Sequence, residues 1–169
     1  ILFGYNSPFE EFDLAVEMQR KGLRTTYPRA IYATAKQAGQ PSYALDDRRF
    51  ERLSMLRSPD GEPVLPVEPD YITIWGYFRG LEDEHAPEGG TMWSPIGLAQ
   101  AHVKGIVSDT ELGSFVDRQR HVLAQAGYED LDLKPSHILL SYIPGGELKR
   151  SDDGQVEIRQ CNFELIKRL

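Results

Sequence analysis

Apolar residues recur at helical spacing near the start of the chain and predict an α-helix over residues 7–21. Ser7, Pro8 and Glu10 form the sequence signature of a capped helix N-terminus, because Ser and Glu three residues apart can cap each other. Gly22 is a natural C-terminal stop. The expected apolar face consists of Phe9, Phe12, Ala15 and Val16.

A second and longer helix is predicted over residues 108–126. Ser108 and Glu111 repeat the capping pattern, and Gly127 ends the helix. Its expected apolar face is Leu112, Phe115, Val116, Val122, Leu123 and Ala126. Residues 94–107 are also predicted to be helical, although two glycines interrupt them.

Strand-forming residues dominate four other segments, which are 29–34, 71–78, 136–143 and 154–163. The last two are joined by a turn-rich stretch. Residues 36–69 have the composition of an insertion, with a short helix predicted at 45–56. This order of helices and strands predicts an α+β fold.

The 169 residues suit one ordinary domain, and 40% apolar with 27% charged residues is globular composition. A formal charge of -7 argues against binding to nucleic acid or to an anionic membrane surface. No apolar run has the length of a transmembrane helix. Cys161 is the single cysteine, which excludes an intrachain disulfide. We therefore expect a cytoplasmic protein.

The segment "DLDLKPSHILL", residues 130–140, resembles the catalytic loop of the protein-kinase-like superfamily, H-R-D-L-K-P-x-N followed by an apolar strand. That superfamily includes bacterial sugar and lipopolysaccharide kinases. The resemblance implies that Asp132 is the catalytic aspartate and Lys134 the loop lysine. His137 then replaces the metal-binding asparagine. In "CNFEL", residues 161–165, Asn162 replaces the aspartate of D-F-G.

Upstream segments extend the resemblance. The first helix and the strand after it look like the kinase helix αC and its following strand, so Glu11 is the best match for the glutamate that pairs with a nucleotide-binding lysine, with Glu10 and Asp13 as rivals. The strand at 71–78 looks like the strand that enters the hinge. Backbone groups at Gly76, Tyr77 and Phe78 would then face an adenine.

The resemblance also implies two parts. Residues 1–80 would form an N-lobe-like part containing the insertion, and residues 81–169 a C-lobe-like part with the catalytic loop. The implied cofactors are ATP and Mg2+, and the implied phosphate acceptor is a protein or a glycolipid. Asp132 would accept the proton of the attacking hydroxyl, and the metal would neutralise the phosphates.

The sequence departs from the kinase pattern in ways that point to impaired catalysis. No Gly-rich loop or V-A-I-K-like strand precedes the first helix, and Asp130 and Leu131 stand where His and Arg are usual. Asn162 and His137 both weaken a magnesium site, which prefers carboxylates. Simpler interpretations are that Asp132 starts a turn, that Asn162 satisfies backbone groups, and that His137 is structural.

Three functional hypotheses follow. The first is a kinase-like domain without effective catalysis that binds nucleotide or a partner. The second is an active ATP-dependent phosphotransferase whose flanking segments complete the site. The third is an unrelated α+β domain.

Overall fold

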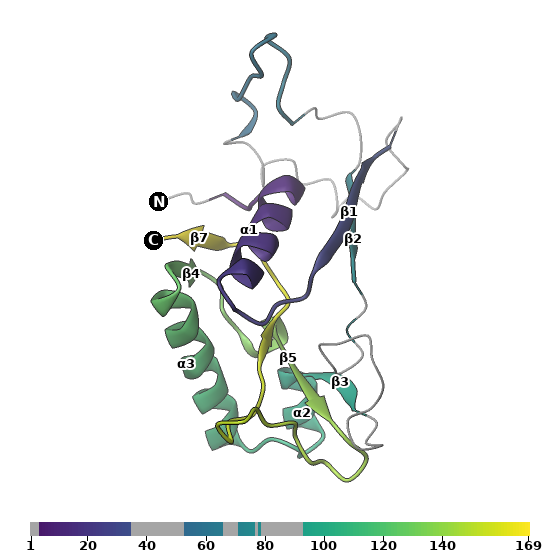
Figure 1. The fold of residues 1–169 in the computed structure, drawn as a ribbon, viewed down its shortest axis with the longest axis vertical. Helices are drawn as coiled ribbons and strands as arrows, with labels where there is room; N and C mark the ends of the chain where they lie inside the picture. The colour runs from purple at the N-terminus through teal and green to yellow at the C-terminus, as the bar shows by residue number, and fades with distance from the viewer. Residues whose placement is uncertain (1–3, 35–52, 66–70, 77, 79–92) are drawn as a thin grey trace.

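The computed structural model describes residues 4–34, 53–65, 71–76, 78 and 93–169. It is a mixed α+β structure, as the sequence predicted, with helices beside small antiparallel sheets (Figure 1). The helices are α1 (Pro8–Arg20), α2 (Leu98–Val103), α3 (Asp109–Gln125) and the short 3-10 helix η4 (Pro135–His137). The strands are β1 (Pro28–Ala33), β2 (Tyr71–Trp75), β3 (Ser94–Gly97), β4 (Tyr128–Asp130), β5 (Ile138–Tyr142), β6 (Arg159–Gln160) and β7 (Ile166–Arg168).

The strands form three antiparallel groups. β1 pairs with β2, β5 lies between β3 and β6, and β4 pairs with β7. The predicted strands at 29–34, 71–78 and 136–143 are confirmed, apart from one to three residues at their ends. The predicted strand at 154–163 shrinks to the two residues of β6, and Val156 makes only an isolated bridge to Arg150.

Helix α1 begins as predicted. The Ser7 side chain accepts from the Glu10 N–H at 3.2 Å, and Glu10 accepts from the Ser7 N–H at 2.7 Å. Its predicted apolar face is only partly correct, because Ala15 is buried but Phe12 and Val16 are only half-buried. The buried residues are Leu14, Ala15 and Met18, whereas Phe9 is 47% exposed and its ring lies edge-to-face with that of Tyr71. This face of α1 packs against residues of β4 and β7, among others. The sequence did not predict these two strands.

Helix α3 also matches its prediction, with a capping box between Ser108 and Glu111. Phe115 and Leu123 are buried, and Gln119 between them is a buried polar residue on the same face. The helix predicted at 94–107 is confirmed only over α2, and it is wrong over its first and last four residues. The first four form β3, because they pair with β5 from Ser94↔Tyr142 to Gly97↔Leu139 before the chain turns into α2.

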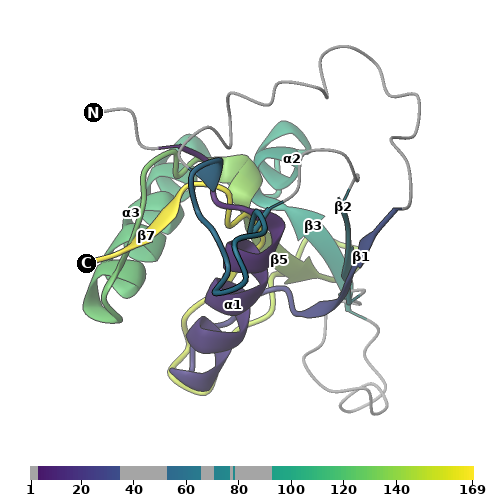
Figure 2. The same cartoon turned by 90° about the horizontal axis from the view of Figure 1, so that it is seen from above.

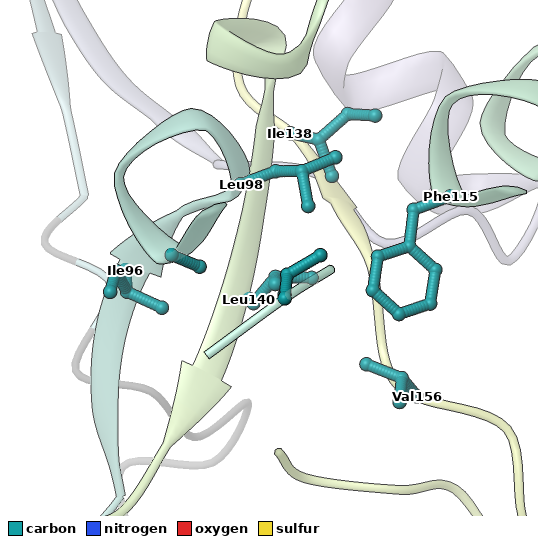
Figure 3. Packing of buried hydrophobic residues seen from close by; sticks show 8 residues of the cluster. Ile96, Leu98, Phe115, Ile138, Leu140 and Val156 are labelled. Carbon is teal, nitrogen blue, oxygen red and sulfur yellow. The ribbon is translucent and has the colours of Figure 1, made fainter. Parts of the chain in front are cut away.

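Two apolar clusters form the core. The first joins α2, α3, β3 and β5 (Figure 3), and it comprises Ile96, Leu98, Ala101, Val107, Phe115, Ile138, Leu140 and Val156. The second joins α1 to α3, β4 and β7, and it comprises Leu14, Ala15, Met18, Leu123, Tyr128, Phe163 and Ile166. The second cluster therefore positions α1 directly beside the segment that follows residue 160.

Asn6, two residues before α1, is hydrogen-bonded to the segment at residues 163–166. Its Nδ2 donates to the carbonyl oxygens of Phe163 (2.8 Å) and Ile166 (2.7 Å), and its N–H donates to the Glu164 carbonyl at 2.7 Å. Asn6 is buried, so these bonds satisfy groups that water does not reach.

The β1–β2 ribbon lies on one side of α1, and α3 lies on the other, as the views from the front and from above agree (Figures 1 and 2). These two strands pair antiparallel from Pro28↔Trp75 to Ala33↔Tyr71. Only residues 53–65 of the predicted insertion are described, where Arg57 bridges to Pro63. Most of the helix predicted at 45–56, and the boundary predicted at residue 80, lie outside the described residues.

Candidate functional site

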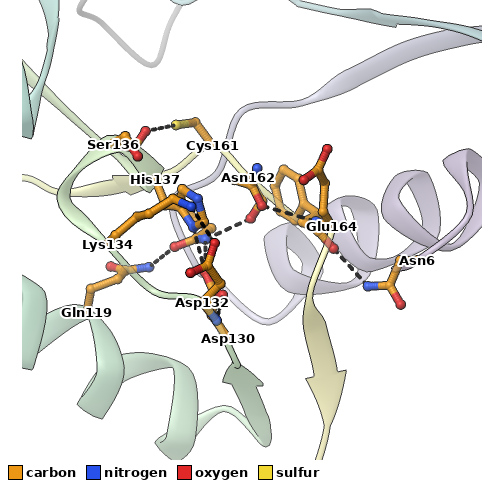
Figure 4. A network of polar contacts seen from close by, with 12 residues as sticks. Asn6, Gln119, Asp130, Asp132, Lys134, Ser136, His137, Cys161, Asn162 and Glu164 are labelled. Carbon is orange, nitrogen blue, oxygen red and sulfur yellow. Dashed lines mark hydrogen bonds and ion pairs between the residues drawn. The ribbon is translucent and has the colours of Figure 1, made fainter. Parts of the chain in front are cut away.

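The loop that resembles a kinase catalytic loop is held at both ends. It leaves β4 at Asp130, and the Leu131 N–H donates to the Leu165 carbonyl at 3.1 Å. Pro135 opens η4, a position where its missing N–H is not needed. The loop therefore connects the β4–β7 pair to the β5–β6 pair. Asp130, Asp132, Lys134 and His137 lie close together on it (Figure 4).

Asp132 and Lys134 form an ion pair on the surface of this loop. About half of each side chain is exposed, with 48% for Asp132 and 50% for Lys134. The ammonium group lowers the pKa of the Asp132 carboxyl, and the carboxylate raises the pKa of Lys134. Asp132 is thus an accessible carboxylate with a cation beside it.

A second carboxylate, Asp130, lies beneath the loop and was not predicted as a site residue. Its side chain is fully buried. Oδ1 accepts from the Asp132 N–H at 3.0 Å, and Oδ2 accepts from Gln160 Nε2 at 3.0 Å. Asp130 points to the same side of β4 as the buried Tyr128, two residues earlier, and this alternation is the signal that could have revealed it.

His137 is buried and lies against Asp130, with 3.2 Å between its Nδ1 and Asp130 Oδ2. A proton on Nδ1 makes this a hydrogen bond to the carboxylate. The backbone of His137 is also used, because its carbonyl accepts from the Cys161 N–H at 3.0 Å. The structure therefore favours the structural interpretation of His137.

Two glutamines extend this polar network into the core. Gln119 of α3 donates to Gln160 Oε1 at 2.9 Å, and Gln160 Nε2 also donates to the Asn162 carbonyl at 2.7 Å. Neither glutamine was predicted, although Gln119 interrupts the apolar face of α3 at the Phe115-to-Leu123 spacing. Gln119 also lines a pocket of about 430 Å³ beside the end of α1, and no predicted site residue lines that pocket.

The residues at the implied metal positions do not fit Mg2+. The Asn162 side-chain oxygen accepts from the Glu164 N–H at 3.1 Å, and the His137 ring faces Asp130. Magnesium prefers carboxylate and phosphate oxygens, which neither side chain supplies. Within the described ranges, no group of three or more His, Cys, Asp and Glu side chains could hold a metal ion.

Trp75 and Phe78 contact β6 and the segment that follows it. The Trp75 ring stacks on Phe163, with centroids 5.2 Å apart and planes 9° from parallel. The Arg159 guanidinium lies 4.3 Å from the centroid of the Phe78 ring. The structure thus brings together the hinge-like and D-F-G-like segments.

The other predicted nucleotide-binding residues are Gly76, Glu11 and Tyr77. The Gly76 N–H donates to the Tyr27 carbonyl at 2.7 Å, and the Tyr27 ring lies so close that a Cβ at this position would overlap it. Glu11 is half-buried on α1. Tyr77 lies outside the described residues.

Cys161 is not suited to act as a nucleophile. Burial raises the pKa of its thiol to about 11, which keeps it protonated near neutral pH.

Among the described residues, no helix is both long enough and apolar enough to cross a membrane. A comparison of the chain with protein-family models, curated proteins and solved structures gives no match in any of the three.

Proposed function

We propose that this chain is a kinase-like domain with impaired catalysis that binds a nucleotide beside the loop of Asp132 and Lys134. The nucleotide base would lie near Trp75 to Phe78, and its phosphates near Lys134. Lysine is a common phosphate ligand because its ammonium acts as a compact positive charge.

One observation carries this proposal, namely the meeting of three segments that are far apart in the chain. Trp75 stacks on Phe163, and Phe78 contacts Arg159. Residues 160–162 contact the 130–137 loop through Gln160 and Cys161. These are the three segments that resemble the kinase hinge, the D-F-G segment and the catalytic loop. Their adjacency supports the resemblance beyond the sequence string.

The impairment is inferred from the metal positions. Phosphoryl transfer relies on metal ions that bridge the phosphates and neutralise developing charge. Asn162 is neutral and its side-chain oxygen already caps a turn, while His137 is bonded to Asp130. Losing one contact of this electrostatic kind costs about two to three orders of magnitude in rate.

The test is ATP binding with and without magnesium, measured by the melting temperature and by calorimetry. We expect millimolar ATP to raise the melting temperature equally in magnesium and in EDTA, because binding to the folded state stabilises it in proportion to occupancy. Lys134→Met should weaken binding. Lys104→Met, at an exposed lysine after α2, is the matched control. No shift at millimolar ATP in either buffer would refute the proposal.

An active phosphotransferase is the second candidate, favoured by the accessibility of both Asp132 and Lys134. The acceptor would then be a hydroxyl of a protein or a glycolipid. ATP turnover by the wild-type chain that Asp132→Asn abolishes would establish this candidate and overturn the impaired one.

A further inference from the structure

A buried carboxylate lies directly under the exposed ion pair of the candidate site. The side chain of Asp130 has no exposed surface, whereas Asp132, two residues later, is about half exposed. A buried carboxylate is costly unless hydrogen-bond donors surround it. Asp130 has three, which are the Asp132 N–H, the Gln160 amide and the His137 ring. These donors hold the Asp130 carboxylate in place, and the carboxylate in turn fixes the positions of the donors.

The two oxygens of Asp130 hold two different parts of the site. Oδ1 accepts from the backbone of the loop at Asp132, so it sets the turn that presents the Asp132 and Lys134 side chains. Oδ2 binds Gln160 and His137, which belong to β6 and η4. Gln160 is itself fixed by Gln119 of α3 and by the Asn162 carbonyl. One side chain therefore links the loop to the segment that resembles D-F-G.

We propose that Asp130 is a positioning residue that orients the Asp132–Lys134 loop toward the segment at 160–163, an inference that rests on the proposed nucleotide site. It acts through the Asp132 backbone and does not touch the nucleotide. Because both oxygens of Asp130 accept, only a carboxylate serves both sides at once. In Asp130→Asn, one oxygen becomes an NH2 group, which then faces either the Asp132 N–H or the Gln160 and His137 donors.

The experiment uses nuclear magnetic resonance on the whole chain, followed by ATP titration. In the wild type we expect a coupling across the hydrogen bond between the Asp132 amide nitrogen and the Asp130 carboxylate carbon. We also expect slow exchange of the Asp132 amide proton. Asp130→Asn should abolish both signals if its NH2 group faces the Asp132 N–H, and should release Gln160 and His137 if the NH2 group faces them. In either case it should weaken ATP binding about tenfold, which corresponds to about 1.4 kcal/mol.

Two matched variants separate positioning from a general effect on stability. Gln119→Met removes a buried partner of Gln160 but leaves the Asp130–Asp132 bond intact, so it should lower the melting temperature and keep the Asp132 signals. Asp153→Asn makes the same chemical change at another turn, where Asp153 Oδ1 accepts from the Gln155 N–H two residues on. It should leave ATP binding unchanged.

The outcomes distinguish this inference from the proposed function. If wild-type spectra lack the coupling and the Asp132 amide exchanges freely, Asp130 does not position the loop, even if ATP binds. This measurement needs no variant, so it stands if Asp130→Asn fails to fold. ATP binding that Asp130→Asn leaves intact would also overturn the inference. Asp132 signals that are present in a chain without ATP affinity would support the loop geometry and refute the nucleotide site alone.

Discussion

Asp130 is buried and Asp132 is exposed, and this difference assigns their roles. Asp132 is accessible and depends on Lys134 for its low pKa, since the ammonium is the main cause of the shift. We expect Lys134→Met to raise the pKa of Asp132 toward its ordinary value of 3.8. A carbon-detected carboxyl titration measures this directly. Lys149→Met, at a lysine paired with Glu157, is the control and should leave Asp132 unchanged. An unchanged pKa in Lys134→Met would show that the pair does not form in solution.

Residue types and spacing alone could point to Asp132 and Lys134, because a contiguous motif carries its own signal. They could not point to Asp130, Gln119 and Gln160, whose roles depend on being buried together. The three come from β4, α3 and β6, and only the tertiary fold brings their side chains within hydrogen-bonding distance. The fold also places the His137 ring beside Asp130 and the Asn162 side-chain oxygen beside the Glu164 N–H.

At the scale of elements, two glycines offer opposite predictions for the same substitution. Gly76 follows β2, and a Cβ there would lie 2.1 Å from the Tyr27 ring. Gly76→Ala should therefore destabilise the fold by about 1–3 kcal/mol, as overpacking does. Gly113 is exposed within α3 with no atom close to its would-be Cβ. Gly113→Ala should stabilise by about 0.5–1 kcal/mol through helix propensity.

Urea denaturation measures both changes. Tyr27→Ser in the Gly76→Ala background is the internal control, because removing the ring should recover part of the lost stability. A neutral Gly76→Ala would mean that the Tyr27 ring moves aside without cost.

Element prediction succeeded where the signals were local. The first residues of α1 and α3 follow from Ser7 and Ser108, whose capping boxes form as the sequence indicated. It failed for β4 and β7, since three-residue strands are too short to show a period. That omission also misdirected the apolar face of α1, whose burying partners include these strands. The helix predicted from 94 failed over residues 94–97 because pairing with β5 outweighed local propensity.

At the scale of the molecule, charged groups tie α1 to the last strand. Arg168 of β7 donates from Nε to Glu17 at 2.8 Å and from a terminal nitrogen to Asp13 at 2.6 Å. The Tyr128 hydroxyl and the Arg168 guanidinium lower the pKa of Glu17 from 4.5 to about 2. Of these two groups, Arg168 is the one that hydrogen-bonds to Glu17, because the Tyr128 hydroxyl has no hydrogen-bond partner in the described part of the chain.

This shift makes stability depend on pH in a stated direction. A carboxyl whose pKa is lower in the folded state stabilises the fold fully above its unfolded value. The contribution of Glu17 is thus present above pH 4.5 and is lost as the pH falls toward about 2. Melting temperatures from pH 2 to 6 should show a shallower slope for Glu17→Gln and for Arg168→Met than for the wild type. An identical slope in all three would contradict the assignment.

The bonds of Asn6 have a consequence for the order in which the chain folds. They join partners 157 and 160 residues apart. Closing a loop costs entropy that grows with its length, and folding slows as the average separation of contacting residues increases. Local pieces such as α3 can form early, whereas the Asn6 bonds require residues 163–166 to have reached the start of α1. We therefore expect the link between the two distant ends of the described chain to form late in folding.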